Sequence, residues 1–105
     1  MSNVTAPQRL LKQPAEVRKY SMDFSNLIAT NESILTSGVY PKITSELING
    51  GSSDLIITSE QVEGNTVSFF CSGGSDGKSY RIEVTIATNA DQIFEGDGIL
   101  RVTDR

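Results

Sequence analysis

Apolar and polar side chains alternate most regularly over Tyr80–Ile86. Positions 80, 82, 84 and 86 carry Tyr, Ile, Val and Ile, whereas positions 81, 83 and 85 carry Arg, Glu and Thr. A period of two is what a strand with one buried face and one solvated face requires. We therefore expect this segment to be a core strand.

Three further segments alternate in the same way and are expected to be strands. They are Tyr20–Phe24, Thr66–Ser72 and Gln92–Thr103. In the last of them the alternation changes phase around Gly96–Gly98. Because glycine inside a strand often marks a bulge, we predict a β-bulge at this point.

Shorter extended segments are expected between these strands. A less regular strand is predicted over Ser33–Val39, extended chain over Lys42–Leu47, and a short β-branched strand over Leu55–Thr58. Pro41 cannot donate to a sheet ladder, so the chain around it should end a strand or lie at a sheet edge.

Turn-forming clusters separate the strands at regular intervals, and no segment has a convincing helical period. The clusters are Asn49–Ser53, Gly64–Asn65, Ser72–Gly77 and Asn89–Asp91. Six or seven short strands in about a hundred residues predict an all-β fold, namely an immunoglobulin-like antiparallel β-sandwich.

The first fourteen residues differ from the rest of the chain. Met1–Pro14 contains two prolines and only the pair Leu10–Leu11 as apolar bulk, so it cannot form a core of its own. We expect an extended N-terminal arm over residues 1–14 and the sandwich over residues 15–105. The arm carries Arg9 and Lys12 and no acid, so a weakly basic arm precedes a body with seven basic and thirteen acidic residues.

Charge, hydropathy and cysteine content narrow the class of protein. The net charge of −4 argues against sequence-independent nucleic-acid binding, which depends on neutralising phosphates. No apolar run approaches the ~18 residues of a membrane-spanning helix, and the first residues lack the apolar core of a signal peptide. The single cysteine, Cys71, cannot form an internal disulfide and is expected in the core.

The residue types needed for catalysis are sparse, so we expect neither an enzyme nor a cofactor or metal site. The chain has no histidine, which excludes serine–histidine and cysteine–histidine nucleophilic sites. One cysteine cannot hold zinc. Asp91, Glu95 and Asp97 lack the dense acid and glycine pattern of a calcium loop. The glycine run Ser72–Gly77 lacks the Lys-Ser/Thr of a phosphate-binding loop and is expected to be a hairpin turn.

The second half of the chain resembles a known family. Asn65–Gly74 (NTVSFFCSGG), Gly77–Thr88 (GKSYRIEVTIAT) and Phe94–Asp104 (FEGDGILRVTD) are similar to the small immunoglobulin-like virion proteins of tailed bacteriophages that act as fiber–tail adaptors or minor tail proteins. Glu16–Phe24 resembles their opening strand, and the likeness spans about residues 14–105.

This resemblance implies a structural virion protein of the phage tail, made in the host cytoplasm, that joins a tail adaptor or nozzle ring to tail fibers. Its partners would be these phage proteins and copies of itself, with no nucleic acid and no membrane. Two alternatives remain open: a capsid decoration protein, and a carbohydrate-binding adhesion module. Gene neighbourhood and glycan binding would separate them.

Contacts with partners are expected at the arm and along the last strand, because sheet edges and unpacked arms are the surfaces that such a domain offers. The candidate partner-binding residues are Arg9, Leu10, Leu11 and Lys12 in the arm, and Glu95, Asp97 and Arg101 in the last strand.

Overall fold

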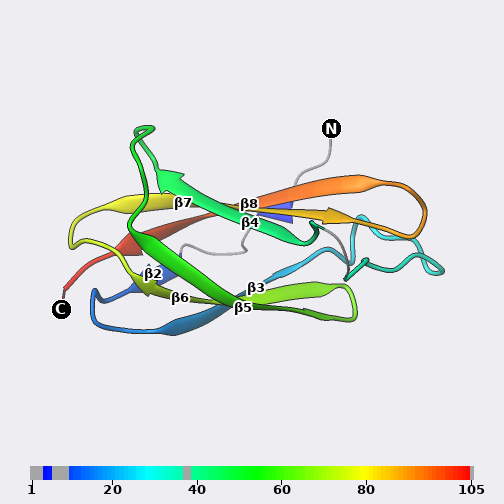
Figure 1. The fold of residues 1–105 in the computed structure, drawn as a ribbon, viewed down its shortest axis with the longest axis horizontal. Helices are drawn as coiled ribbons and strands as arrows, with labels where there is room; N and C mark the ends of the chain where they lie inside the picture. The colour runs from blue at the N-terminus through cyan, green and yellow to red at the C-terminus, as the bar shows by residue number, and fades with distance from the viewer. Residues whose placement is uncertain (1–3, 6–9, 37–38, 105) are drawn as a thin grey trace.

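The computed structural model describes residues 4–5, 10–36 and 39–104. Within them the chain forms strands joined by turns and loops, and no helix (Figure 1). The strands are β1 (Val4–Thr5), β2 (Leu10–Lys12), β3 (Arg18–Asp23), β4 (Lys42–Leu47), β5 (Leu55–Glu63), β6 (Thr66–Gly73), β7 (Ser79–Ala87) and β8 (Ile93–Val102).

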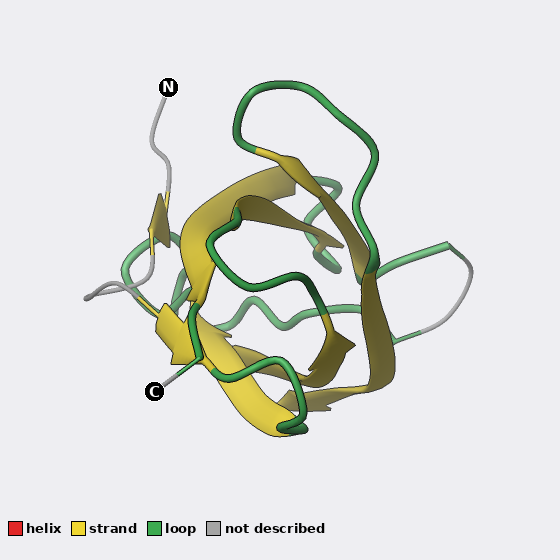
Figure 2. Cartoon of the chain, turned by 90° about the vertical axis from the view of Figure 1, so that its left-hand side faces the viewer, coloured by secondary structure: helices red, strands yellow, loops and turns green. Residues whose placement is uncertain are grey.

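The strands form two sheets that face each other across one core. One sheet has the order β1-β8-β7-β4, with β2 also on β8, and the other has the order β3-β6-β5. Figure 2 looks at the molecule from the left-hand side of Figure 1 and shows the strands of both sheets surrounding its centre. The all-β sandwich is therefore confirmed. The immunoglobulin-like subclass stays a prediction.

The core consists of the apolar residues that the period-two pattern places on one face. Tyr80, Ile82, Val84 and Ile86 of β7 are all fully buried, as expected. Cys71 is buried in β6, and the rings of Tyr20 and Phe69 pack with centroids 6.3 Å apart. The remaining buried apolar residues are Met22, Phe24, Ile28, Ile34, Leu55, Val67, Leu100 and Val102.

The β-bulge predicted at Gly96–Gly98 is wrong. The antiparallel register between β7 and β8 runs without interruption from Ser79 opposite Arg101 to Ala87 opposite Ile93. Both glycines are buried, so they occupy inward positions of an uninterrupted strand. The change of phase arises because Ile93 and Ile99 are apolar residues on the outward face, and not because the strand is irregular.

The bulge in this fold lies instead in β5. The register with β6 shifts between Thr58 and Gln61, and Ser59 has a φ of 58° in the left-handed region. The strand extends to Glu63, beyond the predicted Leu55–Thr58. Its second half is polar because β5 is an edge strand with most of its side chains in solvent.

Two further expectations are corrected by the structure. No strand covers the described residues of Ser33–Val39, where Ile34 makes a single isolated bridge to Thr88. The sheets are not wholly antiparallel, because β1 and β2 both pair with β8 in parallel. Lys42–Leu47 is a full strand at a sheet edge and follows Pro41 directly.

Candidate interaction surfaces

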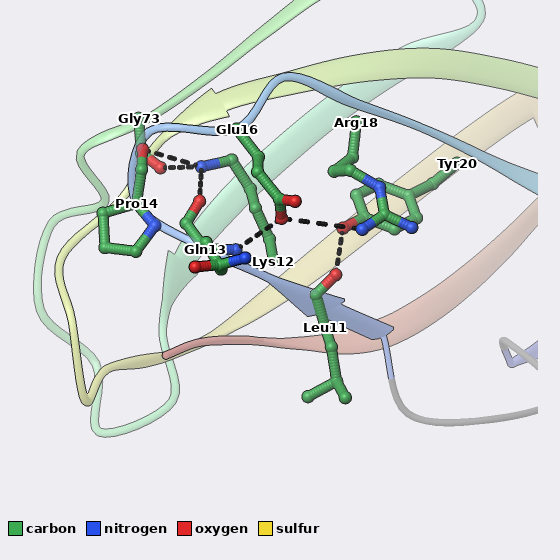
Figure 3. A network of polar contacts seen from close by, with 8 residues as sticks. All are labelled: Leu11, Lys12, Gln13, Pro14, Glu16, Arg18, Tyr20 and Gly73. Atoms are coloured by element: carbon green, nitrogen blue, oxygen red, sulfur yellow. Dashed lines mark hydrogen bonds and ion pairs between the residues drawn. The ribbon is translucent and has the colours of Figure 1, made fainter. Parts of the chain in front are cut away.

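The side chain of Lys12 is fully buried at the left-hand end of Figure 1, which we call the arm end. Its Nζ donates hydrogen bonds to the carbonyl oxygens of Gln13 at 2.8 Å, Pro14 at 3.1 Å and Gly73 at 2.6 Å (Figure 3). Desolvation lowers the pKa of Lys12, whereas nearby acidic groups act in the opposite direction. The bond to Gly73 attaches β2 of one sheet to β6 of the other.

Gly73 suits this contact because its backbone has a conformation that few other residues adopt. Its φ is 76°, and a Cβ atom on it would lie 2.7 Å from the carbonyl oxygen of Asp54. Glycine alone meets both conditions without strain or a clash. The Ser-Gly-Gly turn therefore places the carbonyl that Lys12 binds.

A second hydrogen bond attaches the arm to β3. The Tyr20 hydroxyl donates to the carbonyl oxygen of Leu11 at 2.7 Å, and burial raises the pKa of Tyr20 to about 12. Beside it, Gln13 N–H donates to the Glu16 carboxylate at 2.8 Å, and Glu16 lies 3.5 Å from the guanidinium of Arg18 (Figure 3). The chain from β2 to β3 is therefore fixed at both of its ends.

A hydrogen-bond network among Tyr80, Ser75 and Asp54 stabilises the turn between β6 and β7 at the arm end. The fully buried Tyr80 donates its hydroxyl hydrogen bond to Asp54, and the Ser75 N–H donates to the Tyr80 oxygen at 2.8 Å. The Ser75 hydroxyl donates to the same carboxylate at 2.6 Å. Hydrogen bonds from Ser75 and Tyr80 lower the pKa of Asp54. This network fixes the turn between β6 and β7 against the start of β5.

The candidate contact residues of the arm have different environments. Lys12 is buried, so its ammonium group is not available to a partner. Leu11 is 42% exposed and is available. The backbone of Leu10 pairs with Leu100. Arg9 lies outside the described residues.

The three candidates on β8 lie on the outer face of the five-stranded sheet. Glu95 and Arg101 are exposed and Asp97 is half-buried, whereas Gly96, Gly98 and Leu100 between them point toward the core. Leu11 is the register partner of Arg101, so the structure brings Leu11 of the arm and the three strand candidates together on one face. The sequence did not predict that the arm lies beside β8, because the parallel pairing of two distant segments produces no recognisable pattern in the local sequence.

Glu83 joins the acidic candidates on this face. It is the register partner of Asp97 on β7, next to the pair formed by Thr85 and Glu95. The pKa of Glu83 is raised, first by desolvation and then by the neighbouring carboxylates, although Arg81 lowers it. Sequence reasoning missed Glu83 because it was read only as the solvated side of a core strand.

At the opposite end of the sandwich, which we call the loop end, the carboxylate of Glu32 is largely buried. It accepts hydrogen bonds from the Thr88 hydroxyl, from Gln92 Nε2 at 2.9 Å and from the Ala29 N–H at 3.0 Å. These donors lower the pKa of Glu32. The network attaches the loop after β3 to the turn between β7 and β8.

Several large apolar side chains of the described residues are exposed and were not predicted as contact residues. They are Val17, Leu35, Val39, Ile48, Ile56 and Ile93. The only signal in the sequence was the position of Ile93 out of phase with Phe94, which was attributed to a bulge.

The sheets end in strands with one unpaired side, which are potential pairing surfaces for other chains. The open edges include β4 in one sheet and β3 and β5 in the other. The irregularity at Ser59 interrupts the β5 edge.

Candidate small-ligand sites in the part of the chain that the structure describes include a pocket but no metal centre. No three His, Cys, Asp or Glu side chains there are arranged to hold a metal ion. A shallow pocket of about 260 Å³ at the arm end is lined by Leu47, Ile48, Asn49, Gly77, Lys78 and Ser79. Among the described residues, no helix has the length and apolar character needed to cross a membrane.

Two facing sheets with open edges and an attached N-terminal arm define a protein of the β-sandwich class. The family model described as "Podophage GP4 fiber-tail adaptor protein gp77" matches residues 12–101. This match covers most of the chain, and the protein therefore belongs to that family of phage tail adaptors. No curated protein matches the chain.

The family assignment agrees with the resemblance read from the second half of the sequence, and it places the chain among structural proteins of the virion tail. The match begins at Lys12, the residue whose ammonium group binds Gly73. It includes β3 to β7 and most of β8.

Proposed function

We propose that this protein joins the adaptor or nozzle ring of a phage tail to the tail fibers entirely through protein–protein contacts. It catalyses no reaction, binds no nucleic acid, and is present in several copies that contact one another. It is made in the host cytoplasm and incorporated into the tail. Repeated copies convert interfaces of modest size into a firm attachment.

The observation that carries this proposal is the family match over residues 12–101. The fold supports it, because a sandwich whose loops are fixed at both ends can hold two partners at a constant distance. Lys12 at one end and Glu32 at the other each have three hydrogen-bond partners. A connector benefits from such rigidity, since less freedom is lost on binding.

The proposed contact residues are Leu11, Glu95, Asp97 and Arg101, with Arg9 and Leu10 as further arm candidates. The first four lie on one face of the five-stranded sheet. We leave Lys12 out because its side chain is buried. The arm at residues 1–14 then acts partly as a strand of the sandwich and partly as a contact segment.

Deleting the gene from the phage that encodes this chain tests the proposal. The particles should retain the tail but lack fibers, and electron microscopy of negatively stained particles measures this. Adding the purified protein together with purified fibers should restore them. Fibers on the deletion particles, or a gold-labelled protein that binds the head instead of the tail, would contradict the proposal.

A further inference from the structure

An exposed apolar row crosses the outer face of the five-stranded sheet at the loop end. Ala87 points outward, because its neighbours Ile86 and Thr88 are buried. Ile93 is the register partner of Ala87 on β8 and is 61% exposed. On the other side of Ala87, the N–H of Leu35 donates to the Ala87 carbonyl at 2.9 Å, and Leu35 is 40% exposed.

This row is held in place by buried contacts behind it. Ile34 points into the core and forms the bridge to Thr88, which leaves Leu35 on the outside. The Thr88 hydroxyl donates to Glu32, and Gln92, next to Ile93, donates to the same carboxylate. The apolar row is therefore preorganised and would lose little freedom on binding.

Carboxylates continue the same face directly beside the row. Glu95 is the outward residue after Ile93 along β8, and Asp97 follows it opposite Glu83. None of the carboxylates of Glu83, Glu95 and Asp97 forms an ion pair with a described basic side chain.

The cations of this face lie around the carboxylates. Arg81 is 3.8 Å from Glu46, Lys42 lies on the edge strand β4, and Arg101 lies toward the arm end. The centre of the face is thus acidic, and its loop end is apolar. Charged patches of this kind select partners of the opposite sign and speed their association.

We propose that this face, formed by Leu35, Ala87 and Ile93 with Glu83, Glu95 and Asp97, docks a basic protein surface that presents an apolar side chain. The inference rests on the proposed adaptor function and assigns one of the two connections to this face. A second copy that presents the same face is disfavoured as the occupant, because its carboxylates would meet those of the first copy and like charges repel. The occupant is therefore one of the two components that the adaptor joins.

Two variants of the full chain test this, with particles lacking the adaptor and purified fibers as the two probes. Ile93→Ser removes the apolar anchor, and Glu95→Lys reverses the central charge. Both variants should lose affinity for one probe, the same probe in both cases. The loss should be about tenfold or more, as on truncation of an interface anchor. Affinity for the other probe should be unchanged.

Matched controls come from the other sheet. Ile56 on β5 is 57% exposed, close to the exposure of Ile93, and Glu60 is an exposed carboxylate on the same strand. Ile56→Ser and Glu60→Lys should change either affinity by less than about twofold. Circular dichroism spectra and unfolding midpoints equal to those of the unmodified protein verify that all four variants are folded.

Salt gives an independent readout. Binding of the unmodified protein to the affected probe should weaken when NaCl is raised from about 0.05 M to about 0.5 M, and binding of Glu95→Lys should depend less on salt.

The outcomes separate this inference from the proposed function. If the unmodified protein binds neither probe, the adaptor function itself is wrong. If it binds both and the Ile93 and Glu95 variants bind them equally well, the docking face is wrong while the adaptor function stands. Self-association that sedimentation detects and that Ile93→Ser abolishes would overturn the choice of a basic partner.

Discussion

The two ends of the sandwich each bury a charged side chain, but they satisfy it differently. At the arm end, the ammonium group of Lys12 donates to three main-chain carbonyls. At the loop end, the carboxylate of Glu32 accepts from two side chains and one main-chain N–H. Both arrangements attach a segment outside the central strands to the body.

This difference determines how the two ends respond to mutation. A main-chain carbonyl is not removed by substituting its own side chain, so this contact at the arm end depends on Lys12. The contact at the loop end depends on three side chains, those of Glu32, Thr88 and Gln92. The Glu32 carboxylate, which accepts the hydrogen bonds, can lose its charge by protonation. We therefore expect the Lys12 contact to be sensitive to substitution and the Glu32 contact to be sensitive to acid.

The largest expected effect is that of Lys12→Met. Methionine fills a similar volume but removes the Nζ donor from three carbonyl oxygens, of which that of Gln13 keeps the Glu16 N–H at 3.1 Å. We expect a loss of about 3 kcal/mol in the free energy of unfolding. Urea denaturation followed by circular dichroism measures it. Lys78→Met, at an exposed turn position, is the control and should cost less than about 0.5 kcal/mol. Equal values for the two variants would mean that Lys12 does not secure the arm.

Gly73→Ala should have the next largest effect. The φ of 76° and the approach of 2.7 Å to the Asp54 carbonyl together predict a loss of about 2 kcal/mol. Gly64→Ala separates the two causes, because Gly64 has a φ of 62° and nothing within 4 Å of a Cβ atom. That control should lose only about 1 kcal/mol in the same denaturation measurement. A loss at Gly73 no greater than at Gly64 would contradict the close contact at the arm end.

The sequence predicted the strands with one well-buried face, because that burial imposes a period of two. β3, β6, β7 and β8 all lie within about two residues of the expected segments. The length of the edge strand β5 was underestimated, because its solvated second half has no alternation of apolar and polar residues after Thr58. Apolar residues on an outer face, such as Ile93, carry the same signal as a bulge, and this ambiguity led to the wrong prediction at Gly96–Gly98.

The two ends could not be predicted from local patterns at all. Lys12 and Gly73 are separated by 61 residues, and Glu32 and Thr88 by 56. Lysine and glutamate at such positions usually indicate a solvated surface. Lys12 was accordingly assigned to a partner-binding arm, whereas its side chain is buried. The outer face was predicted only in part, through Glu95, Asp97 and Arg101.

Tyr20→Phe weakens the arm end without removing Lys12. It deletes the hydroxyl that donates to the Leu11 carbonyl at 2.7 Å and leaves the ring in the core. A single hydrogen bond of this kind contributes about 1 kcal/mol, and we expect that loss of stability. Hydrogen exchange at the Leu11 and Lys12 amides should accelerate more than exchange at the β7 amides. Uniform acceleration across all strands would show that the arm opens only when the whole domain unfolds.

The smallest effect, and the one that separates the two ends by pH, concerns Glu32. Hydrogen bonds lower its pKa in the folded protein below the ordinary value of 4.5, so its contribution to stability is present above that value. As the pH falls through the folded pKa, the carboxylate is protonated and the contribution is lost.

Glu32→Gln should therefore be less stable than the unmodified protein at about pH 7, and the difference should shrink as the pH approaches about 3. Urea denaturation across this range measures it, with Glu60→Gln at an exposed position of β5 as the control. Asp54 at the arm end has a lowered pKa as well, so acid alone weakens both ends. Part of the acid sensitivity belongs to the loop end only if the stability difference shrinks with falling pH for Glu32→Gln and not for Glu60→Gln. A difference that stays constant with pH would mean that the charge of Glu32 does not hold the loop, and that the row beside Ile93 is fixed by packing alone.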